Sequence, residues 1–433
     1  MNLISVLKNN HLSAKFHIPK THQRMAAAVW SLEAAEQNFV NLTANENVLS
    51  MTSSRFLTMK LGGRYLLEDL TKPPSSALTA AKGDFTFPSL GAVVNFVREG
   101  QQALSAMLGA DWVEMRPLSG VHATLVTLAS LTSLGDTVFS LAPGQGGHFA
   151  TAPLASRIGR HGLFIPWNER ANEPDYRKLC QKLKSRCGKA LIFIDPGLPL
   201  GPFPLQKLRD ALGPNVTIVY DASHCLGLIA GNVFLNPFNE GADIVQGNTH
   251  KSFPGAHKGI IAGRRADLFQ SIRSVLDNEL VSSCHTGALL ANACTALEMQ
   301  AYGHDYARQM TSLARGLENE LASLGHPTIS GSSTHIVALP VADTSQAAAV
   351  TANLMGVGMR VNSRVVGKTP LLRLGLQELT RRGLQLDDLG ILAGILANSL
   401  ENAMQMEKHR GEIKELARRL SSTTYSFDTK GVF

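Results

Sequence analysis

The sequence predicts an α/β protein with a large domain built on a mostly parallel sheet and a smaller C-terminal α+β domain. From about Val94 onward, short apolar segments alternate with helical stretches, which is typical of a parallel sheet covered on both faces. A chain of 433 residues with 44% apolar content can bury a large core and divide into at least two domains. Polar residues follow several apolar segments, at the sheet edge where such folds bind ligands.

The first expected element is an N-terminal helical arm over 20–39, where Met25, Val29, Leu32 and Ala35 recur at helical spacing. The large domain should contain a helix over 94–108, a turn at Ser119-Gly120 that opens another helix, and six strands, at 137–141, 163–166, 191–195, 217–220, 244–246 and 259–262. A helix over 288–324 should lead to the smaller domain, with strands at 334–340 and 371–374 and one amphipathic helix over 387–420. The predicted division is an arm at 1–50, a cofactor-binding large domain at 51–300 and a small domain at 301–433.

Two strand ends carry the residues that point most directly to chemistry. Asp221 closes the apolar segment Val216–Tyr220, and Lys251 follows the next such segment about thirty residues later. A lysine can form a Schiff base with pyridoxal phosphate, and an aspartate can keep the ring nitrogen protonated so that the ring withdraws electrons. Taken singly, Asp221 could be a helix N-cap and Lys251 a solvated loop residue. Their order within a βαβ pattern favours the cofactor.

Six segments in register over most of the chain resemble the serine hydroxymethyltransferase family, a branch of the fold type I (aspartate aminotransferase-like) pyridoxal phosphate enzymes. The segments are Leu42-Thr43-Ala44-Asn45-Glu46-Asn47, Pro117-Leu118-Ser119-Gly120, Gly146-Gly147-His148, Asp221-Ala222-Ser223-His224, Thr249-His250-Lys251 and Leu372-Arg373-Leu374-Gly375. The resemblance implies this fold and this cofactor.

The resemblance assigns a cofactor role to several further residues. Ser119 and Gly120 stand where a loop enters a helix, so that backbone N–H groups can bind the cofactor phosphate at the positive end of the helix dipole. His148 corresponds to a ring that stacks on the cofactor, and His224 to a histidine near the cofactor oxygen and the substrate carboxylate. Thr249 and His250 precede the lysine and are counted with the cofactor site. The structural alternatives are an N-cap at Ser119, a turn histidine and a core histidine.

The substrate side is expected at Arg373 and Asn45. Arg373 lies among leucines in a predicted strand, where an unpaired guanidinium would be costly, and its fork matches a carboxylate. A structural ion pair is the alternative. Asn45 replaces the family's serine and can still donate a hydrogen bond to the substrate.

The resemblance also implies a homodimer with shared active sites. In the family, an N-terminal arm wraps the partner subunit, and a glutamate and a tyrosine reach into the neighbouring site. Glu68 and Tyr65 are the counterparts expected here, although their spacing requires a gap. A surface loop is the alternative for both residues.

The folate half of the family pattern is altered. Asp84-Phe85-Thr86-Phe87 replaces a tyrosine-containing segment that borders folate, and Asn362-Ser363-Arg364 replaces a folate-contacting asparagine loop, which then runs directly to the arginine strand. We therefore expect an aldolase or transaldolase that cleaves Cα–Cβ of a serine- or threonine-type β-hydroxy amino acid through a glycine quinonoid, with an amino acid and an aldehyde as partners. The alternatives are a folate-dependent hydroxymethyltransferase, a diverged decarboxylase, aminotransferase or oxidase, and a non-catalytic binding protein.

Composition argues against other classes of protein. The formal charge of +7 is spread along the chain without aromatic interleaving, so nucleic-acid binding is not expected. Five cysteines without paired CxxC spacing suit reduced thiols, and we expect neither disulfides nor a metal site. No apolar run is long enough for a membrane span, and the N-terminus lacks a signal-peptide pattern. These observations predict a cytoplasmic protein.

Overall fold

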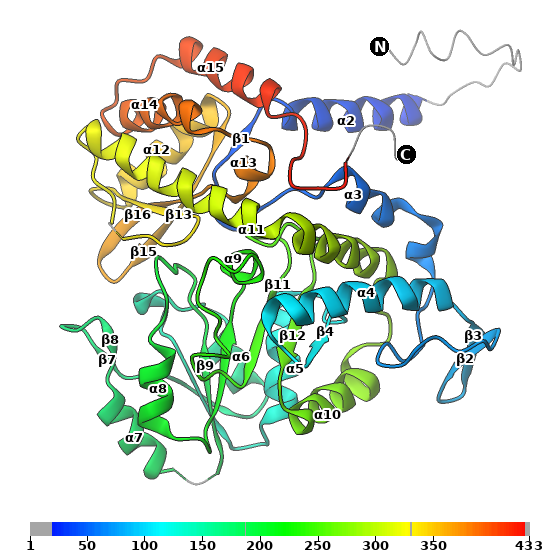
Figure 1. Cartoon of the computed structure of the whole chain (residues 1–433). Coiled ribbons are helices and arrows are strands. Elements are labelled where there is room, and N and C mark those ends of the chain that lie inside the picture. The colour runs from blue at the N-terminus through cyan, green and yellow to red at the C-terminus, as the bar shows by residue number, and fades with distance from the viewer. Residues whose placement is uncertain (1–19, 187, 330, 429–433) are drawn as a thin grey trace, which may run out of the picture.

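Two hydrophobic cores, joined by one long helix, organise the chain (Figure 1). The structure, a computed structural model, describes residues 20–186, 188–329 and 331–428. Helix α11 (Thr286–Ser323) contributes Tyr306 and Met310 to the larger core and Leu313 and Leu317 to the smaller one. The two parts of the molecule therefore share a continuous backbone element rather than a loose linker.

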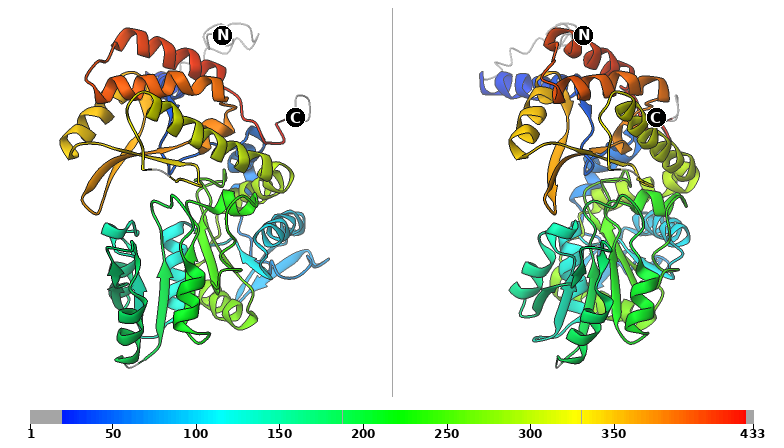
Figure 2. Two further views of the ribbon diagram at one scale, coloured as in Figure 1. Left: turned by 60° about the vertical axis from the view of Figure 1, so that its left-hand side comes forward. Right: turned by 90° about the vertical axis from the view of Figure 1, so that its left-hand side faces the viewer.

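The larger core surrounds a seven-stranded sheet with helices on both faces (Figure 2). In spatial order the strands are β4 (Trp112–Glu114), β12 (Gly259–Gly263), β11 (Ile244–Asn248), β10 (Thr217–Asp221), β9 (Ala190–Ile194), β5 (Thr137–Ser140) and β6 (His161–Phe164). Only β12 runs antiparallel to its neighbours, so the predicted mostly parallel α/β sheet is confirmed. The helices of this part are α4 (Gly91–Leu108), α5 (Gly120–Leu131), α6 (Thr151–Arg157), α7 (Tyr176–Lys184), α8 (Leu205–Leu212), α9 (Leu226–Ala230) and α10 (Ala266–Val275).

The central strands β9 and β10 are mostly buried apolar runs, as parallel strands covered on both faces require, and β11 is buried as well although it contains the polar Gln246. Polar residues stand where these strands end. Asp221 and Asn248 close β10 and β11, Asp195 directly follows β9, and Ser140 closes β5. Because the carboxyl ends of parallel strands share one sheet edge, this arrangement gathers polar side chains from distant parts of the sequence.

The smaller core is built on the sheet β13 (Ile336–Pro340), β16 (Thr369–Gly375) and β15 (Asn362–Val366). Its helices are α12 (Thr344–Gly356), α13 (Gln377–Arg381), α14 (Leu389–Leu400) and α15 (Met406–Arg419). The short strand β1 (Val40–Asn41) pairs with β14 (Met359–Arg360), so the N-terminal segment enters this core through Val40 and Leu42.

Helix α2 (Lys20–Glu36) confirms the expected N-terminal helix, and its apolar residues Met25, Val29, Trp30 and Leu32 are exposed. Residues 1–19 of the predicted 1–50 arm lie outside the described residues. The division at 50 and 300 stays a prediction. Across the described residues, no helix has the length and apolar character needed to cross a membrane.

The single C-terminal helix expected over 387–420 is wrong. The chain forms α14 and α15, separated at 401–405, where Asn402 adopts a left-handed conformation (φ +55°) and Ala403 N–H donates to the Asn398 carbonyl. These features are typical of a helix C-terminus, and asparagine tolerates that conformation. Helix α14 is also largely apolar and buried, whereas α15 is charged and amphipathic, so the two helices pack differently.

The segment before the arginine strand was expected to be a loop, but it forms a β-hairpin. Val366 pairs with Thr369 across a two-residue turn, and Gly367 takes a positive φ of 60° that suits such a turn. Elements that the sequence did not indicate include α3 (Met51–Thr58), the hairpin β2 (Thr79–Lys82) and β3 (Phe85–Pro88), and the short pair β7 (Trp167–Asn168) and β8 (Glu173–Pro174).

Candidate active site

A small cavity at the carboxyl edge of the sheet brings together five of the residues expected to act there. Gly120, His148, Asp221, His224 and Lys251 line it, with Val121, Thr124, Thr151, Asp195, Pro196, Gly197, Ser223 and Asn248. These residues come from the segments that follow β5 and β9, from the ends of β10 and β11 and the residues after them, and from the starts of α5 and α6. The cavity is therefore a product of the sheet topology.

Lys251 follows β11 and directs its amine into this cavity. Its Nζ lies 3.2 Å from Nε2 of His224. Burial lowers the pKa of Lys251 to about 8, against the opposing attraction of Asp221. A neutral, nucleophilic amine is therefore much more accessible near physiological pH than at an ordinary lysine.

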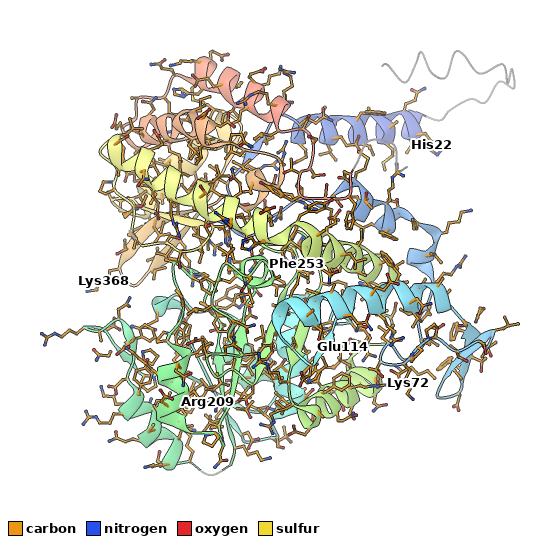
Figure 3. The ribbon with its side chains drawn as sticks, viewed as in Figure 1. His22, Lys72, Glu114, Arg209, Phe253 and Lys368 are labelled. Carbon is orange, nitrogen blue, oxygen red and sulfur yellow. The ribbon has the colours of Figure 1, made fainter. Side chains whose placement is uncertain are left out.

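The loop that carries Lys251 is held rigidly by the side chain of Thr249. Its buried hydroxyl donates to the Ala256 carbonyl at 2.5 Å and accepts from Lys258 N–H at 3.2 Å and from the Asn292 amide at 3.0 Å. Phe253, two residues after Lys251, is fully buried in the middle of the molecule (Figure 3). Thr249 lies outside the cavity lining, so the structure gives it a loop-closing position.

Asp221 is fixed by two hydrogen bonds at the end of β10. One oxygen accepts from Ser223 N–H at 2.9 Å and the other from the Gln246 amide at 3.1 Å. Gln246 lies directly across on β11 and is itself oriented by Thr124 and Thr127. The carboxylate is thus held in one orientation before any ligand arrives.

The N-terminus of α5 forms another wall. Ser119 is the N-cap, and its hydroxyl accepts from His122 N–H at 3.1 Å. A Cβ at Gly120 would lie 3.1 Å from the Asn248 side chain, so a larger residue would require that side chain to shift by a few tenths of an ångström. This geometry suits an anion at the helix N-terminus.

His148 is held against the cavity by the end of β9. Its backbone N–H donates to the Asp195 carbonyl at 3.1 Å, and its Nδ1 accepts from Ala150 N–H at 3.3 Å. Burial lowers the pKa of the ring, so it is largely neutral at physiological pH and carries its proton on Nε2. Asp195 is buried, and burial raises the pKa of its carboxyl well above its usual range.

His224 is buried beside the lysine. Burial, followed by the positive charges of Lys251 and Arg373, holds the pKa of its ring well below the usual range. Its Nδ1 has no hydrogen-bond partner among the described residues, and the same holds for Oδ1 of Asn248. Within the part of the chain that the structure describes, two buried polar atoms of cavity residues therefore lack hydrogen-bond partners.

Arg373 lies beside the cavity on β16, where neutral acceptors orient its guanidinium. Nη1 donates to the Gly197 carbonyl at 2.7 Å, Nε to Asn362 at 3.2 Å, and Nη2 to Oδ1 of Asn45 at 3.2 Å. Three of its five N–H donors are used, which leaves one on each terminal nitrogen. Arg373 forms no ion pair with a carboxylate in the described part of the chain, and burial lowers its pKa to about 10. This arrangement suits a bidentate carboxylate ligand.

His250, Tyr65 and Glu68 do not line the Lys251 cavity. The His250 ring stacks on the His257 ring, with the two ring centroids 3.7 Å apart. Tyr65 is 48% exposed, and its ring stacks on that of Phe87 with the ring centroids 5.6 Å apart. Their proposed roles and that of Thr249 stay predictions.

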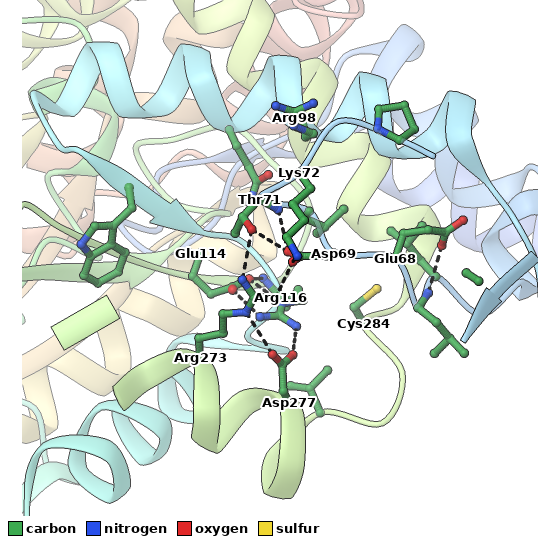
Figure 4. A pocket seen from close by; sticks show the side chains of 18 of the residues that line it. Glu68, Asp69, Thr71, Lys72, Arg98, Glu114, Arg116, Arg273, Asp277 and Cys284 are labelled. Carbon is green, nitrogen blue, oxygen red and sulfur yellow. Dashed lines mark hydrogen bonds and ion pairs between the residues drawn. The ribbon is translucent and has the colours of Figure 1, made fainter. Parts of the chain in front are cut away.

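Glu68 lines a different and larger cavity of about 900 Å³ (Figure 4). Its carboxylate accepts from Leu90 N–H at the start of α4, from the Ser89 hydroxyl at 3.0 Å and from Leu67 N–H at 3.2 Å. Within one chain, Glu68 therefore stabilises a helix N-terminus and does not face Lys251.

Three residues near the site were not singled out from the sequence. Asp195 carries the same strand-end signal as Asp221. Gln246 is a polar residue inside a buried strand, which indicates a specific partner. Arg364 on β15 donates to the Gly147 carbonyl at 2.6 Å, and no sequence signal places it there, because its position depends on how the hairpin docks.

Comparison with known proteins connects this geometry to a family. The sequence model of serine hydroxymethyltransferase matches residues 98–396. A fluorothreonine transaldolase of Streptantibioticus cattleyicolor is 34% identical over 92% of this chain, which spans 62% of that protein. A serine hydroxymethyltransferase of Archaeoglobus fulgidus is 30% identical, covering 90% of this chain and 89% of its own length. The crystal structure of the L-threonine transaldolase from Pseudomonas fluorescens, in its internal aldimine state, superposes with a TM-score of 0.84 at 28% identity, covering 95% and 96% of the two chains.

The chain belongs to the serine hydroxymethyltransferase family. It is a pyridoxal phosphate enzyme with the fold type I architecture expected from the sequence. The residues present fit this cofactor: a lysine amine and a fixed carboxylate share the cavity, α5 offers an accessible N-terminus, and buried atoms of His224 and Asn248 have no hydrogen-bond partner among residues 20–186, 188–329 and 331–428.

Proposed function

We propose that this protein is a folate-independent transaldolase that transfers the glycine part of threonine, or of a related β-hydroxy amino acid, to an acceptor aldehyde. The observation that carries the proposal is the joint placement of Lys251 and Arg373. The cavity presents an amine, and a guanidinium with one free N–H on each terminal nitrogen lies beside it. Two of the similar proteins reported above are transaldolases named for threonine or its fluorinated form, which supports this reaction class.

When bound, pyridoxal phosphate supplies an electron sink that allows a bond at Cα of an amino acid to break. Lys251 would hold the cofactor through its amine, whose pKa burial lowers to about 8 in the chain alone, and Nζ is the atom that would accept or return a proton. Arg373, with Asn45, binds the α-carboxylate and so fixes which bond at Cα faces the ring. Asp221, held by Gln246, provides the negative charge that favours a protonated ring nitrogen.

The neutral histidines are suited to the oxygen atoms of the reaction. His148 lines the cavity and its Nδ1 accepts from Ala150 N–H, which leaves the proton on Nε2, and Nε2 of His224 lies 3.2 Å from the Lys251 amine. Cleavage of Cα–Cβ in threonine releases acetaldehyde and frees the β-hydroxyl proton. Formation of the new Cα–C bond to the acceptor consumes a proton at the acceptor oxygen, so the exchange balances without an oxidant or reductant.

The test is to incubate the holoenzyme with L-threonine and benzaldehyde in the absence of folate. We expect acetaldehyde and a new β-hydroxy amino acid in equal amounts. Acetaldehyde with free glycine and no new amino acid would instead indicate an aldolase. Carbon dioxide, a keto acid or hydrogen peroxide would indicate the decarboxylase, aminotransferase or oxidase alternatives.

A folate-dependent hydroxymethyltransferase is the second candidate, because the matching family model and the archaeal relative carry that name. Turnover of serine that requires tetrahydrofolate, with no product from threonine and benzaldehyde, would favour it.

We also propose a homodimer, supported by the exposed apolar residues of α2 and by the fact that neither Tyr65 nor Glu68 lines the Lys251 cavity of its own chain. The cytoplasmic location stays a prediction.

A further inference from the structure

Two arginines of the β15–β16 hairpin share one face of its sheet. Arg373 on β16 pairs directly with Asn362 on β15, and Arg364 stands two residues after Asn362. Side chains two residues apart on a strand point to the same side, so Arg364 and Arg373 are diagonal neighbours. Burial first, and then the charge of Arg364, lowers the pKa of Arg373, and the second cause agrees with this proximity.

The hairpin is docked so that Arg364 lies against the cavity wall. Gly367 N–H donates to the Gly144 carbonyl at 2.8 Å, and Nη2 of Arg364 donates to the Gly147 carbonyl at 2.6 Å. Nη1 packs on Gly197, which lines the cavity, since a Cβ there would lie only 2.3 Å from that nitrogen. Arg364 is therefore held against the backbone of Gly147 and Gly197, on the same sheet face as Arg373.

The charge of Arg364 is not balanced within the described residues. It is half-buried and forms no ion pair with a carboxylate there. Asp195 is the carboxyl that attracts it, but both Asp195 oxygens accept other hydrogen bonds, from Thr151 and from Leu141 N–H. Burial raises the pKa of Asp195 well above its usual range and so disfavours a charge on this carboxyl. Among the described residues, neither Arg364 nor Arg373 therefore has a carboxylate as a hydrogen-bond partner, whereas threonine brings only one carboxylate.

We propose that Arg364 binds an anionic group on the acceptor aldehyde, so that the acceptors of this enzyme are aldehydes bearing a carboxylate or a phosphate-type anion. This inference rests on the proposed transaldolase function, in which the donor carboxylate occupies Arg373. The Cα–Cβ bond of threonine breaks, acetaldehyde leaves, and Cα bonds to the carbonyl carbon of the acceptor while Arg364 holds the acceptor's anion. A guanidinium fork suits either anion, and the substrates tested must separate the two.

The kinetic test compares aldehydes that share a skeleton and differ in charge: benzaldehyde, 4-formylbenzoate and 4-formylphenyl phosphate, each with saturating threonine. The natural enzyme should show a higher kcat/KM for at least one anionic aldehyde, and the better of the two identifies the anion. Arg364→Gln should lower kcat/KM for that aldehyde by roughly 10- to 100-fold and leave benzaldehyde within about threefold. Arg364→Lys should retain an intermediate preference, because it keeps the charge but loses the fork.

Lys368→Gln is the matched control. Lys368 is exposed at the turn of the same hairpin (Figure 3), so this variant removes one positive charge without touching the cavity. It should leave the preference for anionic aldehydes unchanged. Equal losses in the two variants would mean that overall charge attracts the acceptor, and this would overturn the assignment to Arg364.

A binding measurement separates failure of this inference from failure of the proposed function. Phenylphosphonate is titrated calorimetrically into holoenzyme saturated with glycine, whose carboxylate occupies Arg373. We expect binding that Arg364→Gln weakens by about tenfold or more and Lys368→Gln does not. If no aldehyde reacts but phenylphosphonate behaves in this way, the transaldolase proposal fails and the anion site stands. If neutral and anionic aldehydes react equally, or Arg364→Gln affects all of them alike, the anion site is refuted and the transaldolase proposal stands.

Discussion

The molecule contains two cavities that differ in how their arginines are paired: those of the larger cavity form ion pairs, and those beside the smaller cavity donate only to neutral oxygens among the described residues. Around the larger one, Arg116 pairs with Glu114 at 2.6 Å and also with Asp277, and Arg273 joins Asp277 at 3.1 Å and Asp69 at 2.8 Å (Figure 4). Every charge of this network has a partner within the chain. Around the Lys251 cavity, Arg364 and Arg373 donate only to neutral oxygens among the described residues.

This difference shows why cavity size alone does not identify an active site. The larger cavity holds about 900 Å³ and its ion pairs tie the 66–75 segment to α10. The smaller one contains a lysine of lowered pKa, an oriented carboxylate and buried atoms without partners. Unsatisfied polar groups are costly unless a ligand satisfies them, so the smaller cavity is where ligands are expected.

The largest effect should come from the lysine itself. Two lysines on the same loop have a pKa lowered to about 8 by burial, Lys251 and Lys258. Nζ of Lys258 donates to the carbonyls of Cys284 and Arg116 at 2.7 and 3.2 Å, whereas Lys251 faces the cavity. Lys251→Ala should reduce turnover by at least about a thousandfold. Borohydride reduction of the holoenzyme should fix the pyridoxyl group to Lys251 in a peptide map, and a label on Lys258 would show that burial rather than cavity access selects the lysine.

The next prediction compares two arginine variants, one expected to lose threonine affinity and the other to lose folding stability. Arg373→Gln should weaken threonine binding by roughly 10- to 100-fold with little change in the melting temperature, because its guanidinium is held for a ligand. Arg116→Gln should do the reverse and lower the free energy of unfolding by about 2–4 kcal/mol, since it leaves the buried Glu114 without its partner. Threonine titrations followed by cofactor absorbance, together with denaturant unfolding, provide both readouts. If Arg373→Gln destabilised the fold and left threonine affinity intact, Arg373 would be a structural residue.

The parts of the fold that depend on local pattern could be predicted from the sequence. Apolar runs identified the central strands, and polar residues at their ends identified Asp221 and Lys251, because strand-end chemistry and parallel topology follow from short segments. Asp195 carries the same signal at the end of β9 and could have been found in this way.

The rest of the site depends on tertiary placement. The position of Arg364 follows from the docking of the hairpin on Gly144 and Gly147, which no periodicity encodes. The helix break before α15 depends on one residue in the left-handed conformation, Asn402, which lies inside an otherwise helical sequence pattern. The expected trans roles of Glu68 and Tyr65 concern a second chain, so neither the sequence nor the geometry of one chain decides them.

The pH dependence of cofactor attachment provides a smaller effect. Below pH 8 the amine of Lys251 is mostly protonated and cannot attack the cofactor aldehyde, so the attachment rate should rise about tenfold per pH unit and level off above pH 8. For a lysine with the ordinary pKa of 10.5, the attachment rate would level off only near pH 10.5. Asp221→Asn removes a negative charge that raises the pKa of Lys251, so its inflection should move below pH 8. Stopped-flow absorbance after mixing apoprotein with pyridoxal phosphate measures both profiles, and an inflection near 10.5 in the natural protein would contradict the burial of the amine.

The smallest effect tests whether Glu68 or Tyr65 contributes to the Lys251 site of a partner subunit. Glu68 caps α4 in its own chain and Tyr65 is half exposed, so either can act at a Lys251 site only through a partner. A subunit with Lys251→Ala and one with Glu68→Gln or Tyr65→Phe should then form mixed dimers with one intact site, which random exchange limits to roughly a quarter of natural activity.

Lys72→Gln, at an exposed side chain of the larger cavity, should remain active as a homodimer and controls for general disturbance of that segment. Unfolding curves of the Glu68→Gln parent are needed, because loss of the α4 cap alone could lower its activity. Inactive parents that exchange subunits, as mass spectrometry of labelled chains can establish, and yet recover no turnover would mean that each chain holds a complete site.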